Sequence, residues 1–373
     1  MLYMLELKKI LRILPVYVID PRQDAQEAIN IGEELELLIS TIGAQIPDRI
    51  IQKLDRPNNA TYIGKGKIEE VAQKVNEKEI DVVVLNTMVK PGQIHALKVQ
   101  LQQVKPDIEV WDRVDLILQI FDKHAQTQEA KLQIKLARMN YMGPRIYGMG
   151  YVLSRQGGGI GTLGVGETNT ELMRRHWRDE KKRITDQLSK IQKSRKQQLD
   201  RRKRAGFKTV SIVGYTNAGK SSLFNLLTGK NNLAKNVLFA TLDSSVGKMY
   251  IEELHTEVLV TDTIGFIRDL PPLLISAFKS TLMESINADL LLHVIDISDP
   301  EIDSKIDVVT DILKELGRND DNLIYVFNKI DIAKDINKEA LVEKYKNFSP
   351  IFISVKKKEG ILAVKNCIKS KLF

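Results

Sequence analysis

The eight residues GYTNAGKS at positions 214–221 constrain the fold of this chain more than any other feature. A β-branched run at 209–213 precedes them, and an apolar helical pattern at 222–227 follows them. Glycines permit a tight turn whose N–H groups face inward, and the start of a helix attracts negative charge. A strand, such a turn and a helix in this order predict a parallel α/β domain with a phosphate-binding loop. For the octapeptide alone, an ordinary strand-to-helix turn is the alternative.

Three further motifs follow expected strands in the same half of the chain. Asp262-Thr263-Ile264-Gly265 follows the apolar run at 258–260, Asn328-Lys329-Ile330-Asp331 follows 323–327, and Ser354-Val355 closes the last expected strand. Doubly wound sheets bind ligands at the carboxyl ends of their strands. The carboxylate of Asp331 accepts hydrogen bonds from guanine N1–H and N2–H, and adenine has no such donor pair. The four motifs together predict a guanine-nucleotide site.

Each motif has an expected part in binding GTP or GDP. Lys220 is expected to reach the β- and γ-phosphates, and the Gly265 N–H to approach the γ-phosphate. Mg²⁺ is expected at Ser221, Thr241 and, through water, Asp262. The residues expected to bind the nucleotide are Gly214, Tyr215, Thr216, Asn217, Ala218, Gly219, Lys220, Ser221, Ser222, Phe239, Thr241, Asp262, Gly265, Asn328, Lys329, Asp331, Ser354 and Val355.

The order of these motifs resembles that of the translation-factor-related GTPases. Phe266 stands where many GTPases carry a glutamine that orients the attacking water, and phenylalanine cannot hydrogen-bond water. We therefore assign no catalytic residue, with Gly265 and Thr241 in supporting roles, and expect slow intrinsic hydrolysis that a partner stimulates. Asn217 is similar to the asparagine with which some GTPases hold K⁺ beside the phosphates; loop geometry is the alternative.

The rest of the chain divides into two further regions. Strands at 15–19, 50–51, 80–85 and 108–110 alternate with helices at 24–42, 67–76 and 93–104, which predicts a parallel α/β domain over 1–122. A helical hairpin is expected over 123–204: an unbroken helix at 114–142, a glycine-rich loop at 148–167 and a helix capped by Thr168 or Thr170. The nucleotide-binding G domain, Ras-like in fold, takes 205–373.

Charge is concentrated in the second helix of the hairpin. The chain carries +8 overall, and residues 171–204 hold 14 lysines and arginines against five acidic residues, a net charge of +9. Such a block favours a polyanionic partner over a merely solvated helix face. Along the same helix Met173, Trp177, Ile184, Leu188 and Ile191 form a narrow apolar stripe, which predicts that Trp177 packs within the hairpin rather than stacking on a base.

Composition excludes several other classes of protein. The single cysteine, Cys367, excludes an intramolecular disulfide framework and a cysteine-cluster metal site. The longest apolar runs are too short for a membrane span, and the first 20 residues lack the pattern of a secretory signal. We expect a cytoplasmic protein, and a monomer.

Outside the G domain the sequence resembles the HflX family of GTPases. The resemblance rests on TYIGKGK at 61–67, on Asp112-Arg113 with the following LILQIF at 116–121, on EAKLQ at 129–133 and on GVGET at 164–168. The segment DTIGFI at 262–267 and AFKSTL at 277–282 are also similar to the family. Lys65 and Lys67 in the first segment have two readings, a phosphate contact or a loop that supports the sheet.

The resemblance implies a ribosome-associated GTPase that binds the large subunit and splits or rescues stalled ribosomes under stress. It implies contacts to ribosomal RNA from Gly157, Gly158, Gly159, Arg174, Arg175 and Arg178. Leu163 and Val165 depart from the basic residue and the proline usual in the family. Many bacterial members have an extra C-terminal domain; we expect this chain to end one helix after the last strand of its G domain and to lack that extra domain. The alternatives are a GTP-binding RNA-binding module and a GTPase of ribosome assembly or tRNA modification.

Overall fold

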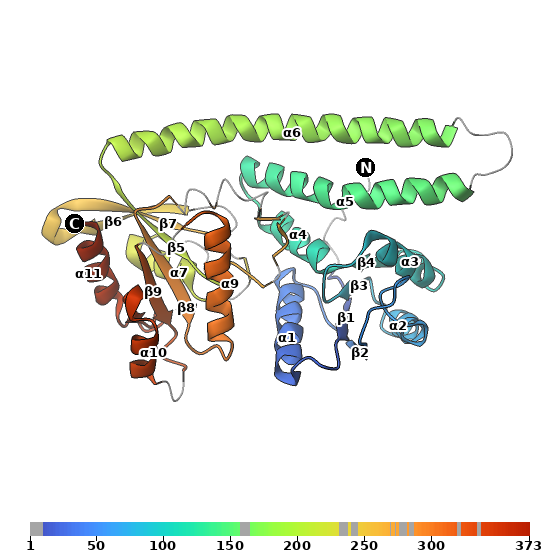
Figure 1. Cartoon of the computed structure of the whole chain (residues 1–373), viewed down its shortest axis with the longest axis horizontal. Helices are drawn as coiled ribbons and strands as arrows, with labels where there is room; N and C mark the ends of the chain where they lie inside the picture. Colours follow the sequence, from blue (N-terminus) through green and yellow to red (C-terminus); the bar gives the residue numbers. More distant parts are fainter. Residues whose placement is uncertain are drawn as a thin grey trace. The chain divides into compact units, whose positions relative to one another are not determined.

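The computed structural model describes residues 10–156, 165–230, 238–239, 245–268, 270–272, 274–275, 282, 287–318, 322–333 and 337–373 (Figure 1). It contains two compact units. One comprises Met1–Lys123 and Arg138–Lys182, and the other comprises His124–Ala137 and Arg183–Phe373. The two long helices therefore contribute to both units. The division into domains at 122 and 204 stays a prediction.

The first unit contains a four-stranded sheet in the order β2-β1-β3-β4, and every pairing is parallel. This confirms the α/β arrangement expected from alternating strands and helices. Its strands are β1 (Ile13–Ile19), β2 (Ile50–Lys53), β3 (Val82–Leu85) and β4 (Glu109–Trp111). Its helices include α1 (Ala25–Thr41), α2 (Lys65–Glu77), α3 (Pro91–Gln102) and α4 (Arg113–His124).

The segment at 61–67 leads from β2 into α2. The side chains of Tyr62 and Ile63 are buried in the core of this unit, and the N–H of Gly64 donates to Oε1 of Gln52 over 3.1 Å. The Nζ atom of Lys67 pairs with a carboxylate oxygen of Glu70 at 2.5 Å. These contacts favour the reading in which this loop supports the sheet.

The unbroken helix expected over 114–142 is wrong, because α4 ends at His124 and α5 (Gln128–Gln156) begins after a break. The hydroxyl of Thr127 accepts the N–H of Ala130 at 3.2 Å, so this threonine caps a new helix. At the start of α4, Oδ1 of Asp112 accepts the N–H groups of Val114 and Asp115, each at 3.0 Å. A short polar side chain therefore caps the first turn of each helix, Asp112 for α4 and Thr127 for α5.

The glycine-rich loop is also shorter than expected, because α5 continues to Gln156 and α6 (Val165–Arg204) begins at Val165. Gly148 and Gly150 lie in α5, and Thr168 and Thr170 lie inside α6 rather than at its cap. A helical glycine costs only about 1 kcal/mol relative to alanine, which a long cooperative helix tolerates. The predicted RNA contacts Gly157, Gly158 and Gly159 lie outside the described residues.

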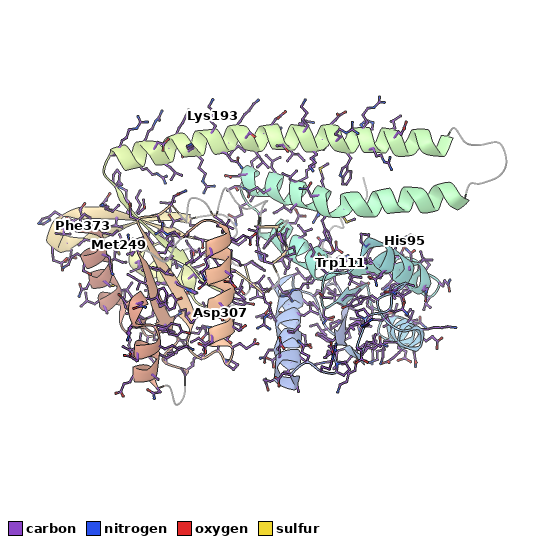
Figure 2. The ribbon with its side chains drawn as sticks, in the orientation of Figure 1. His95, Trp111, Lys193, Met249, Asp307 and Phe373 are labelled. Carbon is purple, nitrogen blue, oxygen red and sulfur yellow. The ribbon has the colours of Figure 1, made fainter. Side chains whose placement is uncertain are left out.

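The helices α5 and α6 run antiparallel (Figure 1). In the first unit, the indole Nε1 of Trp177 donates to the carbonyl of Met139 at 3.3 Å; in the second, Arg195 pairs with Glu129 at 3.0 Å. Ile184 and Leu188 are buried, whereas Lys193, labelled in Figure 2, belongs to the exposed surface of α6. The contacts confirm the helical hairpin and the packing of Trp177 within it.

The second unit carries a six-stranded sheet in the order β10-β9-β8-β5-β7-β6. Only β6 runs antiparallel, against β7. Its strands are β5 (Lys208–Val213), β6 (Ser245–Ile251), β7 (Thr256–Asp262), β8 (Leu290–Asp296), β9 (Leu323–Asn328) and β10 (Ile351–Phe352). Its further helices include α7 (Lys220–Thr228), α9 (Ile302–Glu315), α10 (Lys338–Lys344) and α11 (Ile361–Leu372).

One face of this sheet packs against α7 and α11. Phe224 of α7 and Ile368 of α11 share a buried cluster with Ile212, Leu292 and Val326 of the central strands. Because β5, β7, β8 and β9 are parallel neighbours, their carboxyl ends lie along one edge. All four sequence motifs begin at that edge, as the sequence predicts.

Candidate functional site

The turn between β5 and α7 has a backbone that only glycine can supply at two positions. Gly214 has φ +148°, and a Cβ there would lie 2.3 Å from the carbonyl oxygen of Val294. Gly219 has φ +98°, and its Cβ would lie 2.2 Å from Nδ2 of Asn328. The first glycine lets the turn pass over β8, and the second lets the NKID segment pack against the start of α7.

Asn328 joins three of the four motifs. Its Nδ2 donates to the carbonyl of Ala218 at 2.8 Å, and its Oδ1 accepts the N–H of Val355 at 3.1 Å. The side chain is 3% exposed, so both bonds are shielded from water. One side chain therefore joins the phosphate-binding turn to the two expected base-reading segments.

The carboxylate expected to read the base is held by a serine that follows β10. Oδ1 of Asp331 accepts the hydroxyl of Ser354 at 2.7 Å, and that hydroxyl oxygen in turn accepts the N–H of Lys357 at 3.1 Å. The hydrogen bond from Ser354 lowers the pKa of Asp331 below its usual value. Asp331 therefore stays ionised at neutral pH, as acceptance of two guanine donors requires.

Lys220 lies beneath the turn rather than in solvent. Its side chain is 6% exposed, and Nζ donates to the carbonyl of Tyr215 at 2.8 Å. Burial lowers the pKa of Lys220 to about 8, and the negative charge of Asp262 opposes this shift. An anionic phosphate beside the ammonium would restore its charged form.

The DTIG segment lies against the phosphate-binding turn. Asp262 is fully buried at the end of β7, and the hydroxyl of Thr263 donates to the carbonyl of Ile212 at 2.8 Å. A Cβ on Gly265 would lie 2.7 Å from Cγ2 of Thr216 and 2.9 Å from Nζ of Lys220. Only a residue without a side chain allows this approach.

Phe266 continues the same contact through its backbone. Its N–H donates to the carbonyl of Gly214 at 3.1 Å, and its carbonyl accepts the N–H of Thr216 at 2.7 Å. Its side chain is 1% exposed, so the ring belongs to the core. The ring therefore serves packing, and the group that orients water must be sought elsewhere.

Two features of the site were missed by the sequence analysis. The hydroxyl of Tyr215 accepts the N–H of Arg268 at 2.7 Å, and the guanidinium of Arg268 pairs with Glu301 at 2.9 Å, which ties the turn, the DTIG segment and α9 together. Strand β6 was also missed, although buried Met249, labelled in Figure 2, and Ile251 alternate with exposed Lys248 and Tyr250. That alternation was a usable signal.

The oxygen ligands at this edge suit Mg²⁺. Ser221 lies in the first turn of α7 and Asp262 ends β7, and Mg²⁺ is commonly bound by one or two protein oxygens with phosphate and water supplying the rest. In the described part of the chain there is no group of three or more His, Cys, Asp or Glu side chains that could hold a metal ion by itself. Thr241 lies outside the described residues, whereas Phe239 is described and buried.

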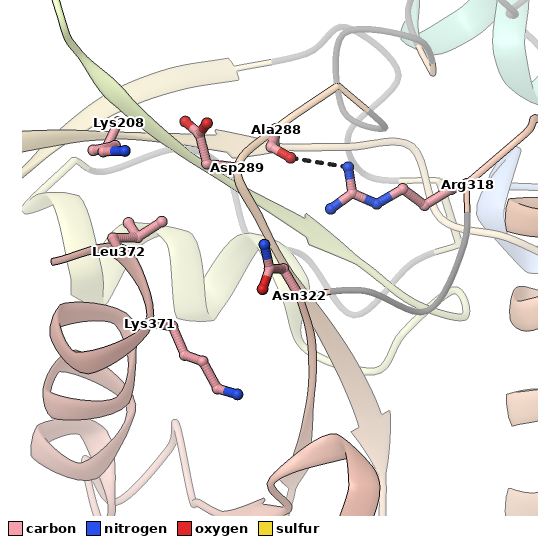
Figure 3. A pocket seen from close by; sticks show the side chains of 7 residues that line it. All are labelled: Lys208, Ala288, Asp289, Arg318, Asn322, Lys371 and Leu372. Carbon is pink, nitrogen blue, oxygen red and sulfur yellow. Dashed lines mark hydrogen bonds between the residues drawn. The ribbon is translucent and has the colours of Figure 1, made fainter.

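A hollow of about 400 Å³ lies at the other end of the same strands (Figure 3). Lys208 begins β5, Asp289 precedes β8 and Asn322 precedes β9, so the hollow is at the amino ends of the strands. It is therefore separate from the nucleotide motifs. It is lined by Lys208, Ala288, Asp289, Arg318, Asn322, Lys371 and Leu372.

In the described residues, no helix is long and apolar enough to span a membrane.

Comparison with protein families gives three matches that together extend over most of the chain. A family described as GTP-binding GTPase N-terminal matches residues 30–122, and one described as GTP-binding GTPase Middle Region matches 124–202. A family described as 50S ribosome-binding GTPase matches 209–329. The chain is also similar to SsGBP in a crystal structure with GDP, with a TM-score of 0.56 and 26% identity, covering 96% of this chain and 98% of that one.

Several curated relatives are similar to this chain over most of its length. GTPase HflX of Caldanaerobacter subterraneus subsp. tengcongensis is 42% identical over 97% of this chain and 81% of its own length. GTPase HflX of Escherichia coli is 38% identical over 81% and 70%, respectively, and that of Methanocaldococcus jannaschii is 36% identical over 90% and 81%. From this similarity, and from the phosphate-binding, base-reading and DTIG segments joined at one sheet edge, we conclude that the chain belongs to the HflX family of GTP-hydrolysing enzymes.

Proposed function

We propose that the GTP-bound form of this GTPase binds the large ribosomal subunit and that hydrolysis releases it. The family described as 50S ribosome-binding GTPase, which matches 209–329, supports this proposal. In the cell, the consequence we propose is the splitting or rescue of stalled ribosomes under stress, by a monomeric protein in the cytoplasm.

The observation that carries the proposal is the exposed basic surface of α6. Residues 171–204 have a net charge of +9, and Arg174, Arg175 and Arg178 are exposed. Arg175, Arg178 and Lys182 are spaced by three and four residues, so they share one face of the helix. Binding to RNA phosphates by such a face gains from counterion release and needs no base contact.

The test is co-sedimentation with purified large subunits in the presence of GDP or of a non-hydrolysable GTP analogue. The test variant is the triple change Arg175→Glu, Arg178→Glu and Lys182→Glu. The matched control reverses three exposed lysines of the G domain, Lys314, Lys344 and Lys346, and so changes the net charge equally. We expect the α6 variant to lose binding by about 10²-fold or more and to show a shallower salt dependence, with the control near wild type.

Two results would contradict the proposal. Equal loss in both triple variants would mean that overall charge, not the surface of α6, governs binding. Equal affinity with GDP and with the analogue would favour an RNA-binding module for which the nucleotide is only a structural ligand, because a ligand cannot shift an equilibrium that it does not distinguish. Preferential binding of assembly intermediates or tRNA would favour the assembly and modification alternatives.

We further propose that Mg²⁺ binds at Ser221, Asp262 and Thr241, and that its charge offsets that of the phosphates. K⁺ at Asn217 is a separate prediction; the left-handed backbone at this residue, with φ +63°, suits an asparagine and so fits the alternative of loop geometry as well. Comparison of hydrolysis rates in KCl and NaCl at equal ionic strength tests it. Equal rates in the two salts would exclude a specific K⁺ site.

A further inference from the structure

The hydrolysis reaction needs a group that orients the attacking water, and Phe266 cannot supply it. Its ring is 1% exposed and its backbone N–H and carbonyl are bonded to the phosphate-binding turn. The missing group must be polar and must lie close to the γ-phosphate position. Hydroxyl groups in the turn and in the DTIG segment are the nearest candidates.

Three of these four hydroxyls already have an observed or expected partner. The hydroxyl of Thr263 donates to the carbonyl of Ile212 at 2.8 Å, and that of Tyr215 accepts the N–H of Arg268 at 2.7 Å. Ser221 is the residue expected to contact Mg²⁺ in a phosphate-binding loop. Each of these three hydroxyls therefore has an observed or expected partner other than the attacking water.

Thr216 differs from them. Its side chain is 7% exposed, and its Oγ1 has no hydrogen-bond partner among the residues that the structure describes. Its backbone N–H is already used by the carbonyl of Phe266 at 2.7 Å, so only the hydroxyl remains. Buried polar atoms nearly always have partners, so each exception calls for an explanation, and a bound ligand can supply one.

The side chain of Thr216 lies at the end of the site where the γ-phosphate is expected. A Cβ on Gly265 would lie 2.7 Å from Cγ2 of Thr216 and 2.9 Å from Nζ of Lys220. In GTPases the lysine of the turn contacts the β- and γ-phosphates, and the glycine of the D-x-x-G segment approaches the γ-phosphate. The Thr216 side chain and Nζ of Lys220 therefore both lie beside Gly265, at the expected γ-phosphate end of the site.

We propose that Thr216 is a catalytic residue and that its hydroxyl group orients the attacking water. The hydroxyl oxygen accepts a hydrogen bond from the water, and the O–H group donates a hydrogen bond to a γ-phosphoryl oxygen. The Thr216 proton is not transferred. The water oxygen forms a bond to the γ-phosphorus while the bond to the β–γ bridging oxygen breaks, and GDP leaves with that electron pair. One water proton passes to the transferred phosphoryl group, giving inorganic phosphate, and Thr216 is unchanged at the end.

The inference rests on GTP binding at this site and does not depend on the ribosome, so the test uses the full chain without ribosomes. Single-turnover hydrolysis and the affinity for a fluorescent GTP analogue are measured for wild type, Thr216→Val and Thr216→Ser. The control is Thr310→Val on α9, where the hydroxyl donates to the carbonyl of Ile306 at 2.9 Å, so it removes a threonine hydroxyl elsewhere. Thermal melting checks the fold of each variant, and Thr216→Ala replaces the valine variant if the latter fails to fold.

We expect Thr216→Val to slow the single-turnover rate about 10²-fold while the affinity for GTP stays within about threefold. Thr216→Ser keeps a hydroxyl and should stay within about fivefold of wild type, and Thr310→Val should match wild type. The proposal is overturned if the valine variant hydrolyses GTP at the wild-type rate. It is also overturned if the serine variant is as slow as the valine variant, or if the loss lies in affinity. Failure of wild type to bind GTP would instead contradict the nucleotide site itself.

Discussion

The side-chain amide of Asn328 donates a hydrogen bond to the carbonyl of Ala218 over 2.8 Å. These residues are 110 positions apart, and the bond fixes the base-reading segment against the phosphate-binding turn. The second bond of Asn328, from the N–H of Val355, adds the last loop to the same assembly. The base and phosphate subsites therefore keep one spacing, which a nucleotide must match at both ends.

Replacement of Asn328 by alanine should therefore weaken nucleotide binding without removing any predicted phosphate contact. The loss of these two hydrogen bonds, one buried and one partly buried, at about 1 kcal/mol each, corresponds to roughly 10- to 30-fold in GTP affinity, with a similar loss for GDP. Fluorescence titration with both nucleotides measures this. Asn366→Ala, an exposed asparagine of α11, is the matched control. Unchanged affinity in Asn328→Ala would mean that the loops hold their spacing by other contacts.

Asp331→Asn should lose the preference for guanine. The amide replaces one of two accepted hydrogen bonds by a repulsive donor, and two bonds to a charged group amount to about 3–6 kcal/mol, or roughly 10²-fold or more in affinity. The same amide can donate to the 2-oxo group of xanthine, so affinity for XTP should rise. Competition titrations with GTP, XTP and ATP measure both changes. A variant that still selects GTP would show that Asp331 does not read the base.

Ser354→Ala tests how Asp331 is held. The hydrogen bond from Ser354 is the largest cause that lowers the pKa of Asp331, so its removal should raise that pKa towards the ordinary value. At neutral pH the carboxylate stays ionised, and the loss of GTP affinity should come only from its freer orientation. We therefore expect a smaller effect than that of Asp331→Asn, and one that grows as the pH is lowered towards 4. An effect of Ser354→Ala as large as that of Asp331→Asn would indicate a direct contact with the base.

Nucleotide binding should take up a proton at alkaline pH. Burial lowers the pKa of Lys220 to about 8, so above that pH the side chain is mostly neutral in the free protein. A bound phosphate favours the ammonium, which raises this pKa, so GTP affinity should fall as the pH rises through the pKa of the free protein. Calorimetry in buffers of different ionisation enthalpy at about pH 8.5 should show uptake approaching one proton, because the terminal phosphate is already ionised there.

Near pH 6.5 the lysine is already charged in the free protein, so Lys220 should contribute no uptake there. The same measurement with GDP is the control, since it also places a phosphate beside Lys220. Absence of uptake at alkaline pH with both nucleotides would show that Lys220 is charged before binding.

Gly265→Ala should impair hydrolysis more than folding. The added Cβ would lie 3.0 Å from Cα of Thr216, a backbone atom that cannot turn aside, so the DTIG segment must move away from the turn. We expect a single-turnover rate reduced by about 10²-fold, because displacement by about 1 Å is costly in catalysis, with a much smaller change in GDP affinity. Gly66→Ala is the control, since a Cβ there meets nothing within 4 Å. A wild-type rate in Gly265→Ala would exclude this close contact from the reaction.

The amino-acid sequence alone predicts the chemistry of the sheet edge at which the nucleotide motifs meet. Its glycines, its lysine and its NKID segment follow apolar strands, and parallel strands necessarily present their carboxyl ends together. The period of the apolar residues likewise predicted both α/β regions and the packing stripe of α6. Apart from the missed strand β6, its errors lay at boundaries: the cap at Thr127 and the helical Gly148 and Gly150 depend on differences of about 1 kcal/mol, which local pattern does not resolve.

Only the tertiary structure decided which side chains of that edge are free for chemistry. Asp331 is oriented by Ser354, Tyr215 is bonded to Arg268, and Phe266 is buried in the core, all through partners between 23 and 53 residues away or on other strands. In the part of the chain that the structure describes, the hydroxyl of Thr216 has no hydrogen-bond partner, and no sequence pattern reveals this. The physical reason is that residue type and spacing determine which interactions a group can make. Its burial and its hydrogen-bond partners, which come from distant segments of the chain, determine whether it is available to bind a ligand.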